Sequence, residues 1–231
     1  MSESSIALNN QAAASANIFI DPAAAVKNMV GRWPWLLPVL ILMIGTVVIV
    51  MVNSPASMEI MQNHPPDNIP PEQLERTLAM MKTFQTVGLV IAPIFVLLKL
   101  VTLAALMMGM SAILDVKTRF SSMFTLLSYA SLITFLQGIA AAIVIKAKAG
   151  QLQSMQELQP PFGLDLLITE SSKAVWAVMN YFSIFTLWHI VILVLAYSYM
   201  TGASRGKAAL AITPAWLLPL LFSVVAAMMQ R

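Results

Sequence analysis

Five long apolar segments follow one another along this chain, and each is long enough to cross a membrane. They cover residues 34–52, 84–114, 124–145, 175–200 and 208–229. A helix needs about 20 residues to cross the roughly 30 Å of hydrocarbon in a bilayer. The hydrocarbon offers the backbone no water to bond, so such a segment crosses as a helix. The sequence therefore predicts an all-α, polytopic integral membrane protein with five transmembrane helices.

The composition supports this class and excludes several kinds of chemistry. Hydrophobic residues make up 59% of the 231 residues and charged residues only 10%, whereas charged residues make up about 25% of an average soluble domain. The chain has no cysteine, which excludes disulfides, thiolate chemistry and cysteine-ligated metals. Its net charge of +3 comes from few charged residues, so nucleic acid is not an expected partner.

The amino-terminal residues differ from the apolar segments that follow. Residues 1–18 are rich in Ser, Asn and Ala and contain no Lys or Arg, unlike a secretory signal. We expect a disordered cytoplasmic tail there, followed by a single five-helix membrane domain over residues 19–231. This domain should begin with a short interfacial helix that has Asp21 as its N-cap, Pro22 in its first turn and Gly31 at its end.

The loops between the spans predict an orientation in the membrane. Both short loops, residues 115–121 and 201–207, contain Lys and Arg, whereas the longer loops contain most of the acidic residues. Basic residues in short loops favour the cytoplasmic side. We therefore expect a cytoplasmic amino end and an external carboxyl end. In the first outer loop, residues 71–83 should continue into the second span as one bent or tilted helix, and residues 160–168 are too short to cross.

Polar side chains inside the spans are the candidate functional residues. Lys99 lies at the middle of the second span, where a charge costs about 2.5–3.5 kcal/mol on insertion scales. Gln137 lies in the third span, and Asn180 and His189 lie in the fourth. Lys99 could extend toward the interface, or bond Gln137 or a carbonyl freed by Pro93. Alternatively, it meets an anionic partner from outside the chain, because no Asp or Glu lies within a span.

Other features of the spans predict packing and exclude catalysis. We expect His189 to form a hydrogen bond across helices rather than a metal site, since the other histidine, His64, lies in an outer loop. Small residues give the second and third spans faces for close helix packing, at Ala105 and Gly109 and at Gly138 and Ala142. No Gly-x-Ser-x-Gly, His-Glu-x-x-His or phosphate-binding glycine loop is present. We therefore expect a non-enzyme without a cofactor or metal.

Five short motifs occur in a characteristic order along the chain. They are FIDP at 19–22, RWPWLLP at 32–38, YASL at 129–132 after Phe120, FTLWH at 185–189 and SRGKA at 204–208. In this order they resemble the bacterial branch of the Yip (Ypt-interacting protein) domain family, over about residues 19–229. The positions that match its motifs most directly are Tyr129, Trp188, Arg205 and Lys207.

The chain also departs from the family pattern. The paired glycines that often precede the third span are replaced by residues 115–119, and the proline expected after YASL is Ile133. The DLYGP-type signature of the eukaryotic branch is missing, so binding of Rab-type GTPases is not carried over.

The resemblance implies a multi-pass protein of the bacterial inner (cytoplasmic) membrane, with no known catalysis. Members act on membranes or through other membrane proteins, and some bacterial members occur alongside MacB-type ABC exporters. Two hypotheses follow. The favoured one is a non-catalytic accessory or scaffold protein that associates with another membrane protein, such as an ABC-type exporter, or with itself. The alternative is a small-molecule or lipid carrier or sensor that uses the polar residues around Lys99. Both include membrane lipids as partners.

Overall fold

The structure is a computed structural model that describes residues 3–30, 32–65, 70–148, 150–153, 155–158, 162–168 and 172–229. This part of the chain is helical and contains no β-strand. Its α-helices are α1 (Glu3–Asn17), α2 (Pro22–Asn28), α3 (Leu36–Asn63), α4 (Pro71–Ile113), α5 (Phe120–Ala147), α6 (Lys173–Tyr181), α7 (Ile184–Thr201), α8 (Arg205–Ala211) and α9 (Thr213–Met229). Two 3₁₀ turns, Met155–Leu158 and Leu164–Leu167, lie in the loop before α6.

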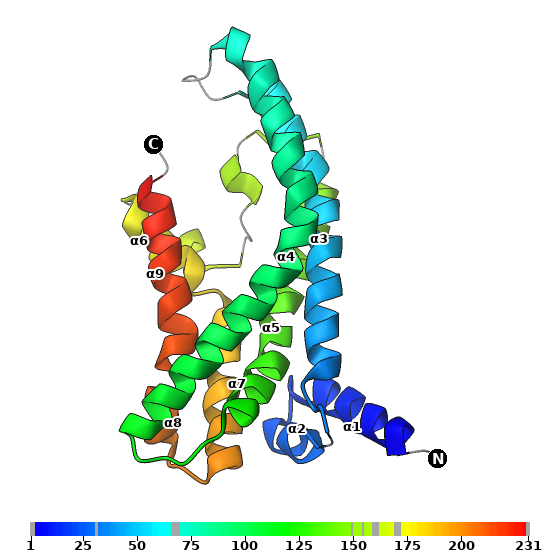
Figure 1. Cartoon of the computed structure of the whole chain (residues 1–231). Coiled ribbons are helices and arrows are strands. Elements are labelled where there is room, and N and C mark those ends of the chain that lie inside the picture. Colours follow the sequence, from blue (N-terminus) through cyan, green and yellow to red (C-terminus); the bar gives the residue numbers. More distant parts are fainter. Residues whose placement is uncertain are drawn as a thin grey trace.

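Five stretches of the described chain are long and apolar enough to cross a membrane. They are α3, α4, α5, α7 and the continuous segment formed by α8 and α9. The predicted all-α membrane fold with five spans and a short amino-terminal helix is therefore confirmed. The two short basic loops lie at the same end of the bundle as α1 and α2, whereas the end of α3, the start of α4 and the end of α9 lie at the other (Figure 1).

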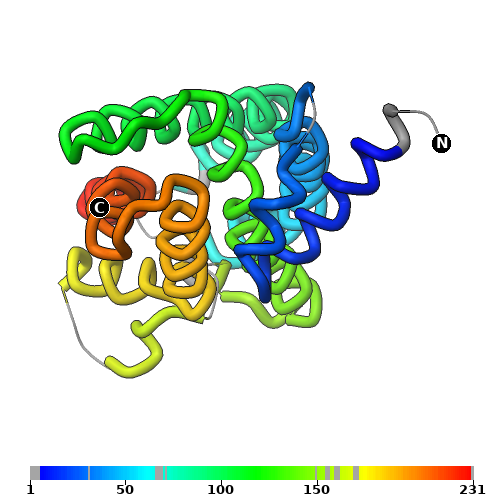
Figure 2. Tube along the Cα trace, turned by 90° about the horizontal axis from the view of Figure 1, so that it is seen from below, coloured from blue at the N-terminus to red at the C-terminus, as the bar shows by residue number. Residues whose placement is uncertain are grey.

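The longest helix, α4, crosses the bundle obliquely (Figure 1). Its 43 residues, at about 1.5 Å each, extend over roughly 65 Å, about twice the hydrocarbon thickness. The helix accommodates this length by tilting and by projecting with α3 beyond the other spans. The prediction that residues 71–83 continue into the second span as one helix is confirmed. Seen along the bundle, α4 and α6 lie on opposite sides, with α7 and α9 between them (Figure 2).

The amino-terminal segment is a helix, so the prediction of a disordered tail is wrong for residues 3–17. Gln11 and Ala14 lie on one face of α1. Ile18 follows directly after the helix, and its N–H donates to the Ala14 carbonyl at 3.0 Å. Ala14 and Ile18 have no exposed surface, and Gln11 is also buried. The sequence pattern did not indicate this buried face, because few side chains in the segment are both apolar and large.

The predicted interfacial helix is present as α2. Asp21 caps it by accepting a hydrogen bond from the Ala24 backbone N–H at 2.9 Å, and Pro22 occupies the first turn. The helix ends at Asn28, earlier than expected. Gly31, its predicted end, lies outside the described residues.

The fourth apolar segment is not one helix, as expected for 175–200, but two. The chain breaks between α6 and α7, where the Ser183 hydroxyl caps α7 by accepting a hydrogen bond from the Thr186 N–H at 3.1 Å. The loop before α6 forms two hydrogen bonds with the residues on either side of the break. Leu164 N donates to the Phe182 carbonyl, and Ile184 N donates to the Phe162 carbonyl, both at 3.3 Å. These tertiary bonds replace the helical bonds that an unbroken span would have made.

The core lies where α5 and α7 pack together, near the end of the bundle that carries α1 and α2. Its largest fully buried side chains include Tyr129 and Leu127 from α5 and Tyr197 and Leu193 from α7. On α4, by contrast, large apolar side chains such as Phe95 and Leu98 are exposed. The outer surface of this helix therefore suits contact with lipid.

Candidate functional site

The four polar residues singled out inside the spans line one cavity. Its volume is about 260 Å³. Five helices contribute to its wall: α4, α5, α6, α7 and α9. Its polar lining residues are Lys99, Ser131, Thr134, Gln137, Asn180, Tyr181, Thr186, His189 and Ser223. The sequence had placed the four candidate residues on three separate spans, and the fold brings them to the same space.

Three local features position these side chains. Ser131, Thr134 and Gln137 recur every three residues on α5, so they lie on one face of that helix. The break between α6 and α7 places Asn180 at the end of a helix of its own, beside the cavity. The helix α4 runs obliquely across the bundle (Figure 1), and its Lys99 lines the same cavity.

Lys99 lies between two cavities. Besides the cavity of about 260 Å³, it lines a second one of about 220 Å³ formed with α3 and α5, and Ser131 and Thr134 line both. The Lys99 side chain is exposed. Within the described part of the chain, no hydrogen bond or ion pair joins its amine to Gln137, to a carbonyl near Pro93 or to a carboxylate. Its ammonium group is therefore available to a group from outside the chain.

His189 forms the expected hydrogen bond across helices. Its Nδ1 lies 2.9 Å from the backbone carbonyl of Ala130 on α5, and its side chain is buried. A carbonyl oxygen only accepts, so Nδ1 must carry the proton and donate. In the neutral ring this leaves Nε2 as an acceptor. Among the described residues, no group of three or more His, Cys, Asp and Glu side chains could hold a metal ion.

The α6 end of the cavity is linked to a carboxylate that the sequence reasoning did not consider. The Asn180 amide donates to Asp165 Oδ1 at 3.3 Å, and the neighbouring Tyr181 hydroxyl donates to the Trp216 carbonyl on α9 at 2.7 Å. Asp165 belongs to the loop before α6. No periodicity in that loop indicates that it folds back against the spans, so the sequence had no signal for this contact.

Three of the four family-motif residues connect distant parts of the chain. Tyr129 on α5 donates to the Pro34 carbonyl at 2.8 Å, before α3. Trp188 on α7 donates to the Phe19 carbonyl at 3.1 Å, before α2. Lys207 on α8 donates to the Leu114 carbonyl at 3.1 Å, at the end of α4. Each donor is a side chain and each acceptor is a backbone carbonyl.

The family of the chain follows from comparison with known proteins. The model of the Yip1 domain family matches residues 16–227, which is nearly the whole chain. The chain belongs to the Yip1 domain family. No curated protein and no solved structure matches it. Proteins of the Yip1 family are membrane proteins that are not known as enzymes, and the five apolar helices agree with a multi-pass member.

Proposed function

We propose that this Yip1-family protein is a non-catalytic membrane protein that binds an anionic group within its helix bundle, as a carrier or sensor of a lipid or small molecule. The observation that supports this proposal is the common cavity of Lys99, Gln137, Asn180 and His189. The cavity gathers neutral hydrogen-bonding groups around a cation with which no carboxylate of the described part of the chain forms an ion pair.

The electrostatic argument rests on what an ammonium group costs within a membrane. A charged side chain at the bilayer centre costs at least about 2.5 kcal/mol and is offset by a paired charge or by water. The other polar side chains around the cavity are amides, hydroxyls and one imidazole. Amide and hydroxyl groups donate hydrogen bonds to phosphate or carboxylate oxygens, while Lys99 supplies the charge. An anionic ligand would thus neutralise the charge of Lys99 and accept hydrogen bonds from several side chains.

The arrangement of the helices also supports access from the lipid. The ends of α4 and α9 that contact each other lie near the short basic loops, and the two helices diverge toward the opposite end (Figure 1). Lys99 on α4 and Ser223 on α9 line the same cavity. The exposed Lys99 side chain is within reach of a lipid that approaches between these helices.

The test measures ligand-dependent stability in detergent. An anionic phospholipid that binds the folded protein raises its unfolding temperature, by linkage. We expect this rise for the wild type and for the control Lys146→Gln, whose lysine is exposed at the end of α5. Lys99→Leu should be at least as stable without lipid and should lose the rise. An equal rise in Lys99→Leu would contradict the proposal.

A second function, as an accessory protein of another membrane protein such as a MacB-type ABC exporter, is supported by the α3–α4 hairpin. This hairpin projects beyond the other spans (Figure 1). Gln85 on α4 donates to the Ser54 carbonyl on α3 at 3.2 Å, which holds the two helices together. The projecting part presents a surface that a partner could contact.

The accessory function is tested by co-purification in mild detergent. The wild type should retain a stoichiometric membrane partner, and the double variant Arg76→Glu, Lys82→Glu on the projecting part of α4 should lose it without losing stability. Recovery of the protein without a membrane partner, or equal recovery of the partner with both proteins, would count against this function.

A further inference from the structure

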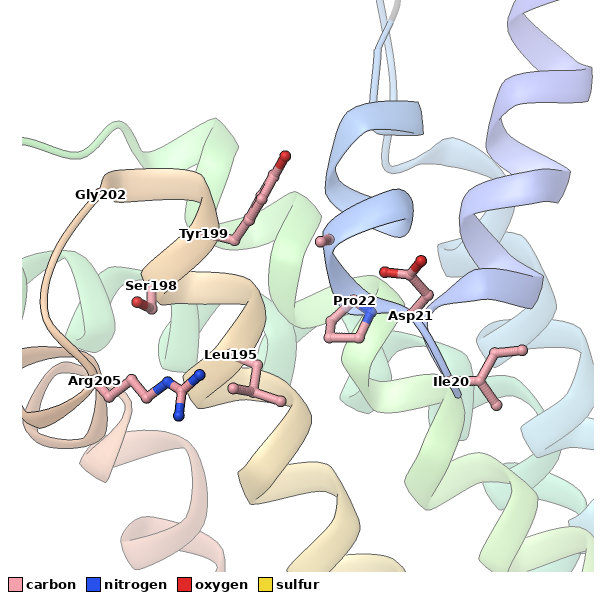
Figure 3. Close-up of a pocket in the computed structure, with 9 residues that line it drawn as sticks. Ile20, Asp21, Pro22, Leu195, Ser198, Tyr199, Gly202 and Arg205 are labelled. Atoms are coloured by element: carbon pink, nitrogen blue, oxygen red, sulfur yellow. The ribbon is translucent and has the colours of Figure 1, made fainter.

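A second polar pocket lies at the end of the bundle that carries α2. Its volume is about 520 Å³, and it is formed by the segment that leads into α2, the end of α7 and the start of α8. Figure 3 shows Asp21 on the α2 side and Arg205 on the α8 side, with Leu195 between them and Tyr199 above. The pocket therefore has an acidic side and a basic side, and it is separate from the cavity around Lys99.

Arg205 differs from the other family-motif residues. Tyr129, Trp188 and Lys207 each donate to a backbone carbonyl, whereas the described residues provide no hydrogen bond or ion pair to the Arg205 guanidinium. Asp21 uses Oδ1 to cap α2, and no cation among the described residues pairs with its carboxylate. The two opposite charges thus share a pocket without neutralising each other directly.

The pocket lies where lipid headgroups are expected. One apolar span ends at Thr201 and the next begins at Arg205, so the turn between them marks a membrane–water boundary. Tyr199 is 47% exposed and Ile20 is 84% exposed, which places an amphipathic ring and an apolar side chain at the rim. Lys27 also lies over the Tyr199 ring, 5.9 Å from its centroid. Apolar and charged groups therefore meet here, as they do in a phospholipid.

We propose that this pocket binds the headgroup of phosphatidylethanolamine. Arg205 binds the phosphate, for which a guanidinium is well suited. Asp21 accepts hydrogen bonds from the ammonium, and the Tyr199 ring lies within the same pocket. Leu195 and Pro22 contact the glycerol and the first methylene groups.

The same charges discriminate against the other common phospholipids. Asp21 repels a headgroup that carries only negative charge, such as phosphatidylglycerol. The trimethylammonium group of phosphatidylcholine has no N–H to donate to the Asp21 carboxylate, so this lipid loses those hydrogen bonds. The selectivity thus requires the charges of both Asp21 and Arg205. It does not rest on the function proposed for Lys99.

The test is lipid competition on the purified full-length protein. Delipidated protein is incubated with equal amounts of the ethanolamine, choline and glycerol phospholipids with identical acyl chains, and the retained lipid is measured by mass spectrometry after gel filtration. Between the two zwitterionic lipids, the wild type should retain mainly phosphatidylethanolamine. Phosphatidylglycerol that is held at the cavity around Lys99 is identified with Lys99→Leu, which should lose it. Asp21→Asn keeps an N-cap residue for α2 but should lower the ethanolamine-to-choline ratio by about tenfold, the effect of losing one charge-assisted hydrogen bond.

Three further variants complete the test. Arg205→Gln should lower retention of all three lipids, and Arg119→Gln, which removes an exposed cation at the other short loop, should change nothing. Asp21→Ser, another N-cap residue, repeats the measurement if Asp21→Asn is unstable. Retention of the ethanolamine and choline lipids in the supplied ratio, a preference of Lys99→Leu for phosphatidylglycerol, or an unchanged ratio in Asp21→Asn would overturn the proposal. Lys99→Leu should keep the preference, which separates this site from the central cavity.

Discussion

The side-chain carbonyl of Gln11 accepts a hydrogen bond from the backbone N–H of Leu37 at 3.0 Å, and its amide donates to the Trp33 carbonyl at 3.1 Å. Leu37 lies in the first turn of α3, whose N-cap residue, Trp35, provides no side-chain hydrogen bond. A residue 26 positions earlier in the chain therefore caps the first membrane span. This contact attaches α1 to the bundle.

Gln11→Ala should destabilise the protein by about 1–3 kcal/mol, because it removes two hydrogen bonds to partly buried backbone groups, each worth roughly 0.5–1.5 kcal/mol. Thermal unfolding in detergent would measure the loss. Asn9→Ala, on the exposed side of the same helix, is the matched control and should unfold like the wild type. Equal unfolding temperatures for both variants would show that the Gln11 contacts contribute nothing to stability.

Asp115→Gly should stabilise the protein by about 1 kcal/mol. Asp115 follows α4 with a φ of 57°, in the left-handed region that favours glycine. Val116 N donates to the Ser111 carbonyl at 2.8 Å and Asp115 N to the Ala112 carbonyl at 3.1 Å, so the helix ends in a Schellman motif. Asp115→Ala removes the same charge, but alanine does not adopt a positive φ as easily as glycine does, so this variant should not stabilise the protein. A gain in both variants would assign the effect to charge.

Tyr197→Phe should lower the free energy of unfolding by about 0.5–1.5 kcal/mol. The Tyr197 hydroxyl lies 2.7 Å from Ser111 Oγ, and both side chains are fully buried between α7 and α4. Tyr199→Phe, two residues along and exposed, is the control. A double variant with Ser111→Ala should cost less than the sum of the two single changes, because both remove the same bond. Additive costs would mean that the pair is not coupled.

Reporter fusions should reveal the orientation. Fusions after Ser121 and after Lys207 should behave as cytoplasmic, and fusions within 54–83 as exported, because the two short basic loops lie at one end of the bundle (Figure 1). Alkaline phosphatase and fluorescent-protein reporters give opposite signals on the two sides and check each other. The reverse pattern would overturn the predicted cytoplasmic amino end and external carboxyl end.

The spans were predictable because length and hydropathy determine whether a helix can cross a bilayer. The break before α7 was not predictable, because it depends on two hydrogen bonds with the preceding loop: Leu164 N donates to the Phe182 carbonyl, and the Phe162 carbonyl accepts from Ile184 N. The helical structure of residues 3–17 was also missed, because a single buried amide, Gln11, and small apolar side chains attach it to the bundle.

The candidate site was partly predictable. Lys99, Gln137, Asn180 and His189 stand out in the sequence because strongly polar groups are rare in apolar spans. Ser131 and Thr134 line the same cavity, but hydroxyl residues are common in membrane helices, so they carried no signal.

The small residues were predicted with mixed success. A Cβ at Gly138 would meet Ile49 at 3.0 Å, and Ala142 is buried, as expected for a packing face. Ala105 is exposed, and a Cβ at Gly109 would meet nothing within 4 Å. Among the helical glycines described, Gly45 is the one where an added Cβ would come closest to a side chain, the Phe135 ring. This close approach was not predicted, because spacing alone does not show which helix face a large residue will oppose.

The bonds of Tyr129, Trp188 and Lys207 end on the backbone carbonyls of Pro34, Phe19 and Leu114. Almost any residue at those acceptor positions presents the same oxygen. Evolution is therefore free to replace the acceptors without any compensating change in the donors. Comparison of many Yip1-family sequences should show three constant side chains with no co-varying partners. Methods that infer contacts from correlated substitutions would therefore miss these bonds between distant parts of the chain.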